Sequence, residues 1–127
     1  MPLNPWFAAN AAVILLCAFV HLLLGGRGMV RPLLRDTELR PVVRDIHYCC
    51  WHLITILMFG MVIVFALAAL GRASADLTLA AVLVFAAYGL WTLGLMLHRK
   101  YRIREMPQWI LFGLIAALGA VGLSDGA

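Results

Sequence analysis

Residues 53–70 read LITILMFGMVIVFALAAL, a run of eighteen residues without a charged side chain. At 1.5 Å of rise per residue, a helix of this length covers about 27 Å, close to the thickness of the hydrocarbon core of a bilayer. Inside a bilayer, a helix satisfies its own backbone hydrogen bonds. We therefore expect a transmembrane helix here, beginning near residue 47 and ending near residue 70.

Three further apolar runs have a similar length and cover residues 6–24, 77–97 and 108–123. The composition agrees, since 65% of the 127 residues are hydrophobic and 13% are charged, whereas soluble domains are roughly 45–50% apolar. A short chain buries a smaller fraction of its area than a large one does, so the surplus apolar surface must face a lipid bilayer. We predict one all-α integral membrane domain over residues 1–127, a bundle of four transmembrane helices.

The basic residues predict how this bundle is oriented. Of the ten Lys and Arg residues, five follow the first span, four follow the third, and one follows the second. Loops rich in Lys and Arg stay in the cytoplasm, so we predict an N-out, C-out topology with both basic loops cytoplasmic. The expected location is the inner (cytoplasmic) membrane of a bacterium. Because the basic residues flank apolar spans, membrane topology accounts for them, and we expect no nucleic-acid partner.

The first cytoplasmic loop contains one more predicted element. Gly25 and Gly26 suit the end of the first helix. Pro32 suits a first helical turn, and Pro41 suits a stop. Residues 32–40 are therefore expected to form a short interfacial helix, with its leucines on the membrane and its charges among the headgroups.

Four histidines lie at the cytoplasmic side of this topology. His21 ends the first span, His47 and His52 begin the second, and His98 ends the third. If the first two helices are antiparallel neighbours, His21 and His52 lie at the same level, each about one turn inside its boundary. The histidines are thus the residues with which we associate a possible site.

Imidazole and thiolate are ligands for zinc, copper and iron, and two imidazoles from facing helices suit a single haem b. Cys17 and Cys49 precede His21 and His52 by four and three residues, so each cysteine shares a helix face with a histidine. The leading hypothesis is a transition-metal or haem b site in a membrane redox protein. It requires its histidines to converge. Its core would be His21, His52 and His98, and a metal ion would also recruit His47, Cys17 and Cys49.

Other functions are compatible with the same residues. Interfacial histidines can simply extend their polar edges to headgroup water. Small residues in the later spans, such as Ala116-x-x-x-Ala120, favour close helix packing, within the bundle, in a homo-oligomer or in a larger membrane complex. The first alternative is therefore a non-enzymatic accessory or structural subunit. The second is an enzyme or binder acting on lipid headgroups or an amphiphile, with Arg27, Arg31 and Arg99 clamping an anion.

Overall fold

The structure is a computed structural model that describes residues 3–125. Every regular element in this part of the chain is a helix. In chain order they are α1 (Pro5–Val20), the π-helix η1 (His21–Val30), α2 (Arg31–Arg35), α3 (Pro41–Ala69), α4 (Ala75–Arg99) and α5 (Gln108–Asp125). The first three join into one stretch, and it, α3, α4 and α5 are each long and apolar enough to cross a membrane. The all-helical class is confirmed, and the structure has four helices with the length and apolar composition predicted for the spans.

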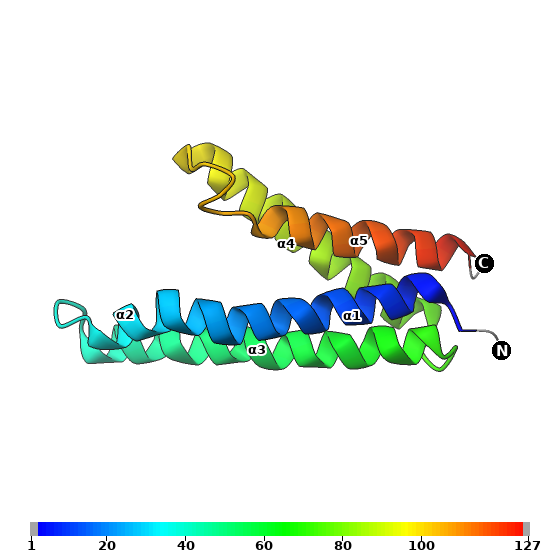
Figure 1. Ribbon diagram of the computed structural model, residues 1–127, viewed down its shortest axis with the longest axis horizontal. Coiled ribbons are helices and arrows are strands. Elements are labelled where there is room, and N and C mark those ends of the chain that lie inside the picture. Colours follow the sequence, from blue (N-terminus) through cyan, green and yellow to red (C-terminus); the bar gives the residue numbers. More distant parts are fainter. Residues whose placement is uncertain (1–2, 126–127) are drawn as a thin grey trace.

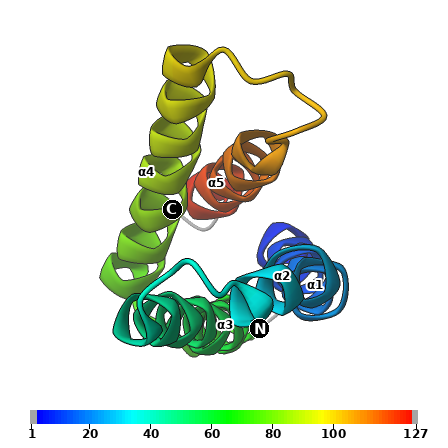
Figure 2. The same cartoon turned by 90° about the vertical axis from the view of Figure 1, so that its left-hand side faces the viewer.

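The spans form two antiparallel hairpins (Figure 1). One pairs α1 with α3, and the other pairs α4 with α5. The hairpins meet at the end where the described chain begins and finishes, and they diverge towards the opposite end, as Figure 2 shows from that side. We call these the closed end and the open end. Both ends of the described part of the chain thus lie on one side of the bundle and both basic loops on the other.

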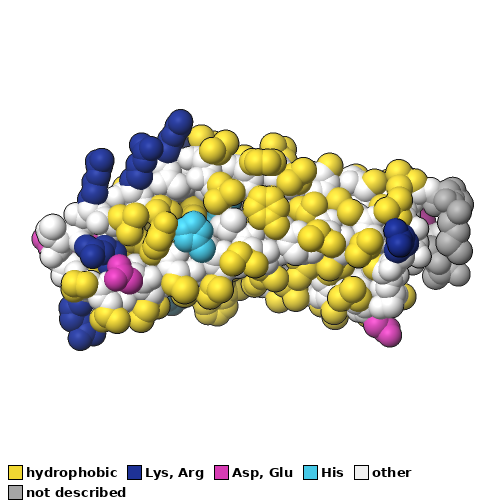
Figure 3. Space-filling model, turned by 90° about the horizontal axis from the view of Figure 1, so that it is seen from below, with side chains coloured by type: hydrophobic (Ala, Val, Ile, Leu, Met, Phe, Trp, Pro, Cys, Tyr) yellow, Lys and Arg dark blue, Asp and Glu magenta, His cyan; other side chains and the backbone are white. Residues whose placement is uncertain are grey.

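The surface is divided along the long axis of the molecule (Figure 3). Lys and Arg side chains gather at the open end, and an apolar belt covers the middle. Large side chains within this belt are well exposed, including Leu16 at 64% and Ile56 at 68%. Such a belt between charged ends matches a protein whose middle lies in lipid.

The core is concentrated where the hairpins meet. Close approach of the helix backbones depends there on two glycines of α5. A Cβ on Gly119 would overlap the Val82 side chain of α4 and lie 3.1 Å from Nδ2 of Asn10 on α1, and one on Gly122 would lie 2.5 Å from the Phe7 ring of α1. Helices in lipid associate through such close contacts. The fully buried large apolar side chains of this core are Ile14, Phe65 and Ile115.

One polar side chain is sealed inside this core and joins the two hairpins. Asn10 of α1 is 0% exposed, and its Nδ2 donates to the Ile115 carbonyl of α5 at 2.9 Å. Its Oδ1 has no hydrogen-bond partner among residues 3–125. An interhelical hydrogen bond of this kind contributes about 0.6 kcal/mol on average in a membrane protein. Asn10 therefore helps to fix how the hairpins meet.

The first span differs from the sequence-based expectation. The helix does not end at Gly25 and Gly26 but continues through η1 into α2. Gly25 has a packing role instead, because a Cβ there would lie 2.6 Å from Cη2 of Trp51 on α3. The position of Gly25 is therefore explained by the close approach of Trp51 on the neighbouring helix, and not by a helix end.

The interfacial helix expected over residues 32–40 also differs from the structure. There, α2 directly follows η1 as a continuation of the first span, and it ends at Arg35. Asp36 stops it, because its Oδ1 accepts the backbone N–H groups of Glu38 and Leu39 at 2.8 and 3.0 Å. A side chain that bonds nearby backbone in this way competes with helix continuation. The chain then turns directly into α3 at Pro41.

Candidate functional site

The most distinctive contact at the open end joins η1 to α3. His21, the first residue of η1, stacks on Trp51 with ring centroids 3.8 Å apart and an interplanar angle of 13°. Its Nε2 lies 3.4 Å from the Trp51 carbonyl, which also accepts the Thr55 hydroxyl at 3.1 Å. Gly25 leaves the indole the space to approach. A π-helical segment is rare and frequently found at functional sites, and here its first residue makes this contact.

His52 lies beside this stack. It directly follows Trp51 on α3, so the imidazoles of His21 and His52 occupy a similar level on neighbouring helices. His52 is exposed, and the Tyr48 ring meets it edge-on with centroids 4.6 Å apart. His21 and His52 thus border the outer surface of the α1–α3 hairpin.

His47 lies further towards the end of the molecule. Its Nδ1 is 2.7 Å from the Val43 carbonyl, and since a carbonyl only accepts, that nitrogen carries the proton. In the neutral ring, Nε2 then keeps its lone pair at an exposed position. Metal-binding histidines commonly have their second nitrogen fixed by a carbonyl in this way. The cysteines are free thiols, with Cys17 half-buried and Cys49 exposed.

His98 belongs to the other hairpin. It stands near the end of α4 and lines a shallow hollow of about 250 Å³. Because α4 packs on α5 and diverges from α3 towards the open end (Figure 2), His98 lies on a different hairpin from the other histidines. Among residues 3–125, no group of three or more His, Cys, Asp and Glu side chains could hold a metal ion. Of the three histidines expected to form the core of a site, His21 and His52 thus lie on the first hairpin and His98 lies on the second.

The arginines considered for anion binding also divide between the hairpins. Arg27 of η1 and Arg31 of α2 lie on the first hairpin and Arg99 of α4 lies on the second, all exposed. Within residues 3–125 the only ion pair is Arg44 with Asp45, at 3.6 Å on the surface. Exposed arginines at the open end remain available to headgroups or other anions.

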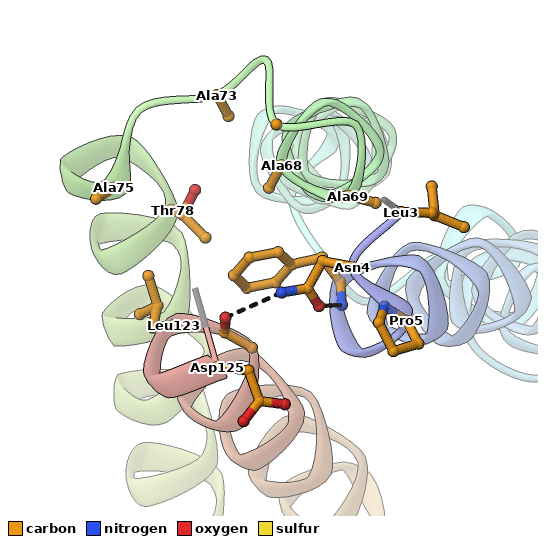
Figure 4. A pocket seen from close by; sticks show the side chains of 13 residues that line it. Leu3, Asn4, Pro5, Ala68, Ala69, Ala73, Ala75, Thr78, Leu123 and Asp125 are labelled. Carbon is orange, nitrogen blue, oxygen red and sulfur yellow. Dashed lines mark hydrogen bonds between the residues drawn. The ribbon is translucent and has the colours of Figure 1, made fainter. Parts of the chain in front are cut away.

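A hollow that the sequence did not predict lies at the closed end (Figure 4). It has a volume of about 630 Å³, and its walls come from α1, α3, α4 and α5. Asn4 caps α1 by accepting the N–H groups of Trp6 and Phe7, and it donates to the Gly122 carbonyl at 3.1 Å. Asp125 accepts the indole N–H of Trp6. These polar groups thus serve to join helix ends, and only the cap, an Asn before Pro5, has a sequence signal.

Comparisons with known proteins give no relative for this chain. No protein-family model matches it, and neither a curated protein nor a solved structure does. What the protein does must be inferred from its own residues and their arrangement.

Proposed function

We propose that this protein is a non-enzymatic subunit that works by binding another membrane-spanning chain. The observation that carries this proposal is the divergence of the two hairpins (Figures 1 and 2). Buried residues concentrate near the closed end, whereas η1 and α2 bury none. Two hairpins that diverge towards the open end leave faces there that a partner helix can cover.

The physical basis is close packing. In lipid there is no hydrophobic driving force between helices, so association depends on dispersion contacts and interhelical hydrogen bonds. The closed end has both, through the glycines of α5 and the buried Asn10. A chain that binds towards the open end adds such contacts where the two hairpins no longer provide them for each other.

The same proposal includes an orientation. The protein is embedded in the inner membrane of a bacterium. Its open end, which has nine of the ten Lys and Arg residues, faces the cytoplasm. There Arg27, Arg31 and Arg99 face anionic headgroups, each contributing about 1 kcal/mol near the surface. The partner is then held in the cytoplasmic half of the bilayer.

The mass of the protein extracted from its membrane tests the association. Light scattering after mild detergent extraction, together with cross-linking in intact membranes, is expected to give an assembly larger than the 14.0 kDa chain. Peptide mass spectrometry of that assembly identifies whether it holds more copies or another protein. A single chain of 14.0 kDa by both methods contradicts the proposal.

A metal site on the α1–α3 hairpin is a second candidate. His21 and His52 lie at one level, and the Nδ1 contact of His47 leaves its Nε2 free to bind. A partner chain would complete such a site. A haem b between α1 and α3 does not fit at this level, because Trp51 covers one face of His21 and fills the space beside Gly25.

Elemental analysis and an absorption spectrum test this candidate. Near-stoichiometric zinc, copper or iron is expected to be lost in His21→Ala and His52→Ala and kept in His98→Ala, which changes a histidine on the other hairpin. Metal content that is equal in all three variants contradicts a site on α1 and α3.

A further inference from the structure

The hollow at the closed end is large enough to hold a small molecule. Its volume of about 630 Å³ lies within the range of ligand-binding sites, about 300–1,000 Å³. Short alanine side chains line it, Ala68 and Ala69 at the end of α3 and Ala73 and Ala75 around the start of α4 (Figure 4). Because these side chains fill little space, the region between the four helix ends stays open. We call this cavity the closed-end hollow.

The rim of the closed-end hollow is formed by helix ends that are held by hydrogen bonds within the chain. Gly71 has a φ of 66°, which glycine adopts without strain, and its N–H donates to the Ala68 carbonyl at 3.0 Å. The N–H of Arg72 donates to the Leu67 carbonyl at 2.8 Å, so α3 ends in a Schellman motif. The residue before each of α1 and α4 caps that helix with its side chain. A site built in this way exists before a ligand binds, and binding then loses little affinity to ordering of the chain.

The charges around the hollow favour a cation. Among residues 3–125, Asp125 at the end of α5 is the one charged side chain in its lining, and it stands at the edge of the hollow (Figure 4). Asp125 Oδ2 accepts the indole N–H of Trp6, and the carboxylate forms no ion pair within the described residues. The closed end also has Asp76 and one basic residue, Arg72. Its side chains are therefore net negative over residues 3–125, and a field of this sign attracts cations.

The remaining lining suits an apolar body that carries a positive group. Phe7 and Leu123 provide an aromatic and a branched apolar wall, and the face of an aromatic ring attracts cations. The Thr78 hydroxyl donates to the Ser74 carbonyl at 2.9 Å, so it can only accept a hydrogen bond from a ligand. Within residues 3–125 the hollow thus offers apolar contact, an aromatic ring and hydrogen-bond acceptors, but no positive side chain that could hold an anion.

We infer that the closed-end hollow binds an organic cation, with an ammonium group beside Asp125 and an apolar body between Phe7 and Leu123. This goes beyond the proposed function and does not depend on it, because the hollow lies at the opposite end from the faces assigned to a partner. Its walls come from both hairpins, so a bound cation stabilises the junction between them. Such an ammonium group is carried either by a phospholipid headgroup or by a free amphiphilic amine, and the experiment separates the two.

Titration calorimetry with the full chain in nanodiscs tests the inference. The probe is hexyltrimethylammonium. Its matched controls are 1-hexanol and hexanesulfonate, which have the same alkyl chain with no charge and with a negative charge. After subtraction of uptake by empty nanodiscs, the cation is expected to bind saturably and several-fold more tightly than either control. Equal binding of the three compounds would show apolar partitioning alone and would overturn the inference.

Two pairs of variants locate the binding site. Asp125→Asn keeps the shape of the side chain and an acceptor for Trp6, and it is expected to weaken binding of the probe about five-fold, as loss of a surface charge pair does. Asp76→Asn, which changes a carboxylate outside the lining, is expected to leave binding unaltered. Ala75→Leu fills the hollow and is expected to abolish binding, whereas Ala80→Leu, at an exposed position of α4 outside the lining, keeps it. Equal affinities within either pair overturn the inference.

The lipid of the nanodisc separates the two sources of the ammonium group. Phosphatidylcholine has a trimethylammonium headgroup, whereas digalactosyldiacylglycerol is also neutral overall but has no ammonium. If a headgroup occupies the hollow, the probe is expected to bind several-fold more weakly in phosphatidylcholine than in the galactolipid, and equal affinities assign the hollow to a free cation. Both assignments require Asp125→Asn to weaken binding in the galactolipid, and an unchanged affinity there overturns the site for either source.

Discussion

Replacing Gly119 with alanine is expected to destabilise the junction of the hairpins by about 1–3 kcal/mol, the usual cost of overpacking a filled core. The added Cβ would overlap the γ2 methyl of Val82, and it would lie 3.1 Å from Asn10 Nδ2 and 3.5 Å from the Phe65 ring. None of these neighbours can yield freely. Val82 has a stiff, β-branched side chain, and Asn10 is held by its hydrogen bond to Ile115.

Gly113→Ala is the matched control on the same helix, because a Cβ there would meet nothing within 4 Å. Both substitutions gain the same helix propensity, about 0.8–1.0 kcal/mol at most, so the difference between them isolates packing. Unfolding by SDS in mixed micelles, followed by tryptophan fluorescence, measures that difference. A Gly119→Ala protein that is as stable as Gly113→Ala would refute the packing assigned to the closed end.

Three further predictions concern other parts of the fold. In a background with Trp51 as the only tryptophan, Gly25→Ala is expected to displace the indole from His21 and change the fluorescence of Trp51. Gly26→Ala is the control, because Gly26 has open space around it, and its spectrum is expected to be unaltered. Equal spectra of the two variants would argue against the stack. Asn10→Ala is expected to cost about 0.6–1.7 kcal/mol in the same SDS unfolding assay, the range for interhelical hydrogen bonds in membranes, and a stabilised variant would contradict its joining role. Cys49, exposed near the start of α3, is expected to react with a membrane-impermeant maleimide in inverted vesicles and not in intact cells, and the reverse result would invert the proposed orientation.

The sequence predicted the elements of this fold better than their arrangement. Uncharged runs such as residues 53–70 are sufficient for the four spans, because lipid imposes a length and a polarity on each helix independently of its neighbours. Helix ends were less predictable. Gly25 and Gly26 have the residue type of a helix stop, but Gly25 is required by the indole of Trp51 on another helix, a contact that local sequence does not reveal.

The candidate site depended even more on tertiary structure. Sequence spacing suggested that His21 and His52 share a level, and the stack of His21 on Trp51 is consistent with it. Sequence spacing gave no indication that α4, which holds His98, diverges from α3. The hairpins meet through residues far apart in the chain, such as Gly122 of α5 and Phe7 of α1, and local sequence does not reveal such a pairing.

The divergence of the hairpins is the central claim, and paired spin labels measure it most directly. The labels are attached in a background with Cys17, Cys49 and Cys50 replaced by alanine. One label pair at Ile46 of α3 and Leu97 of α4 samples the open end, and a pair at Leu70 and Leu77 samples the closed end; all four positions are exposed. In lipid nanodiscs the open-end distance is expected to be much longer than the closed-end distance, with a narrow distribution in the assembled protein. Short distances at both ends would mean that α1, α3, α4 and α5 close into a complete bundle, and would contradict the account.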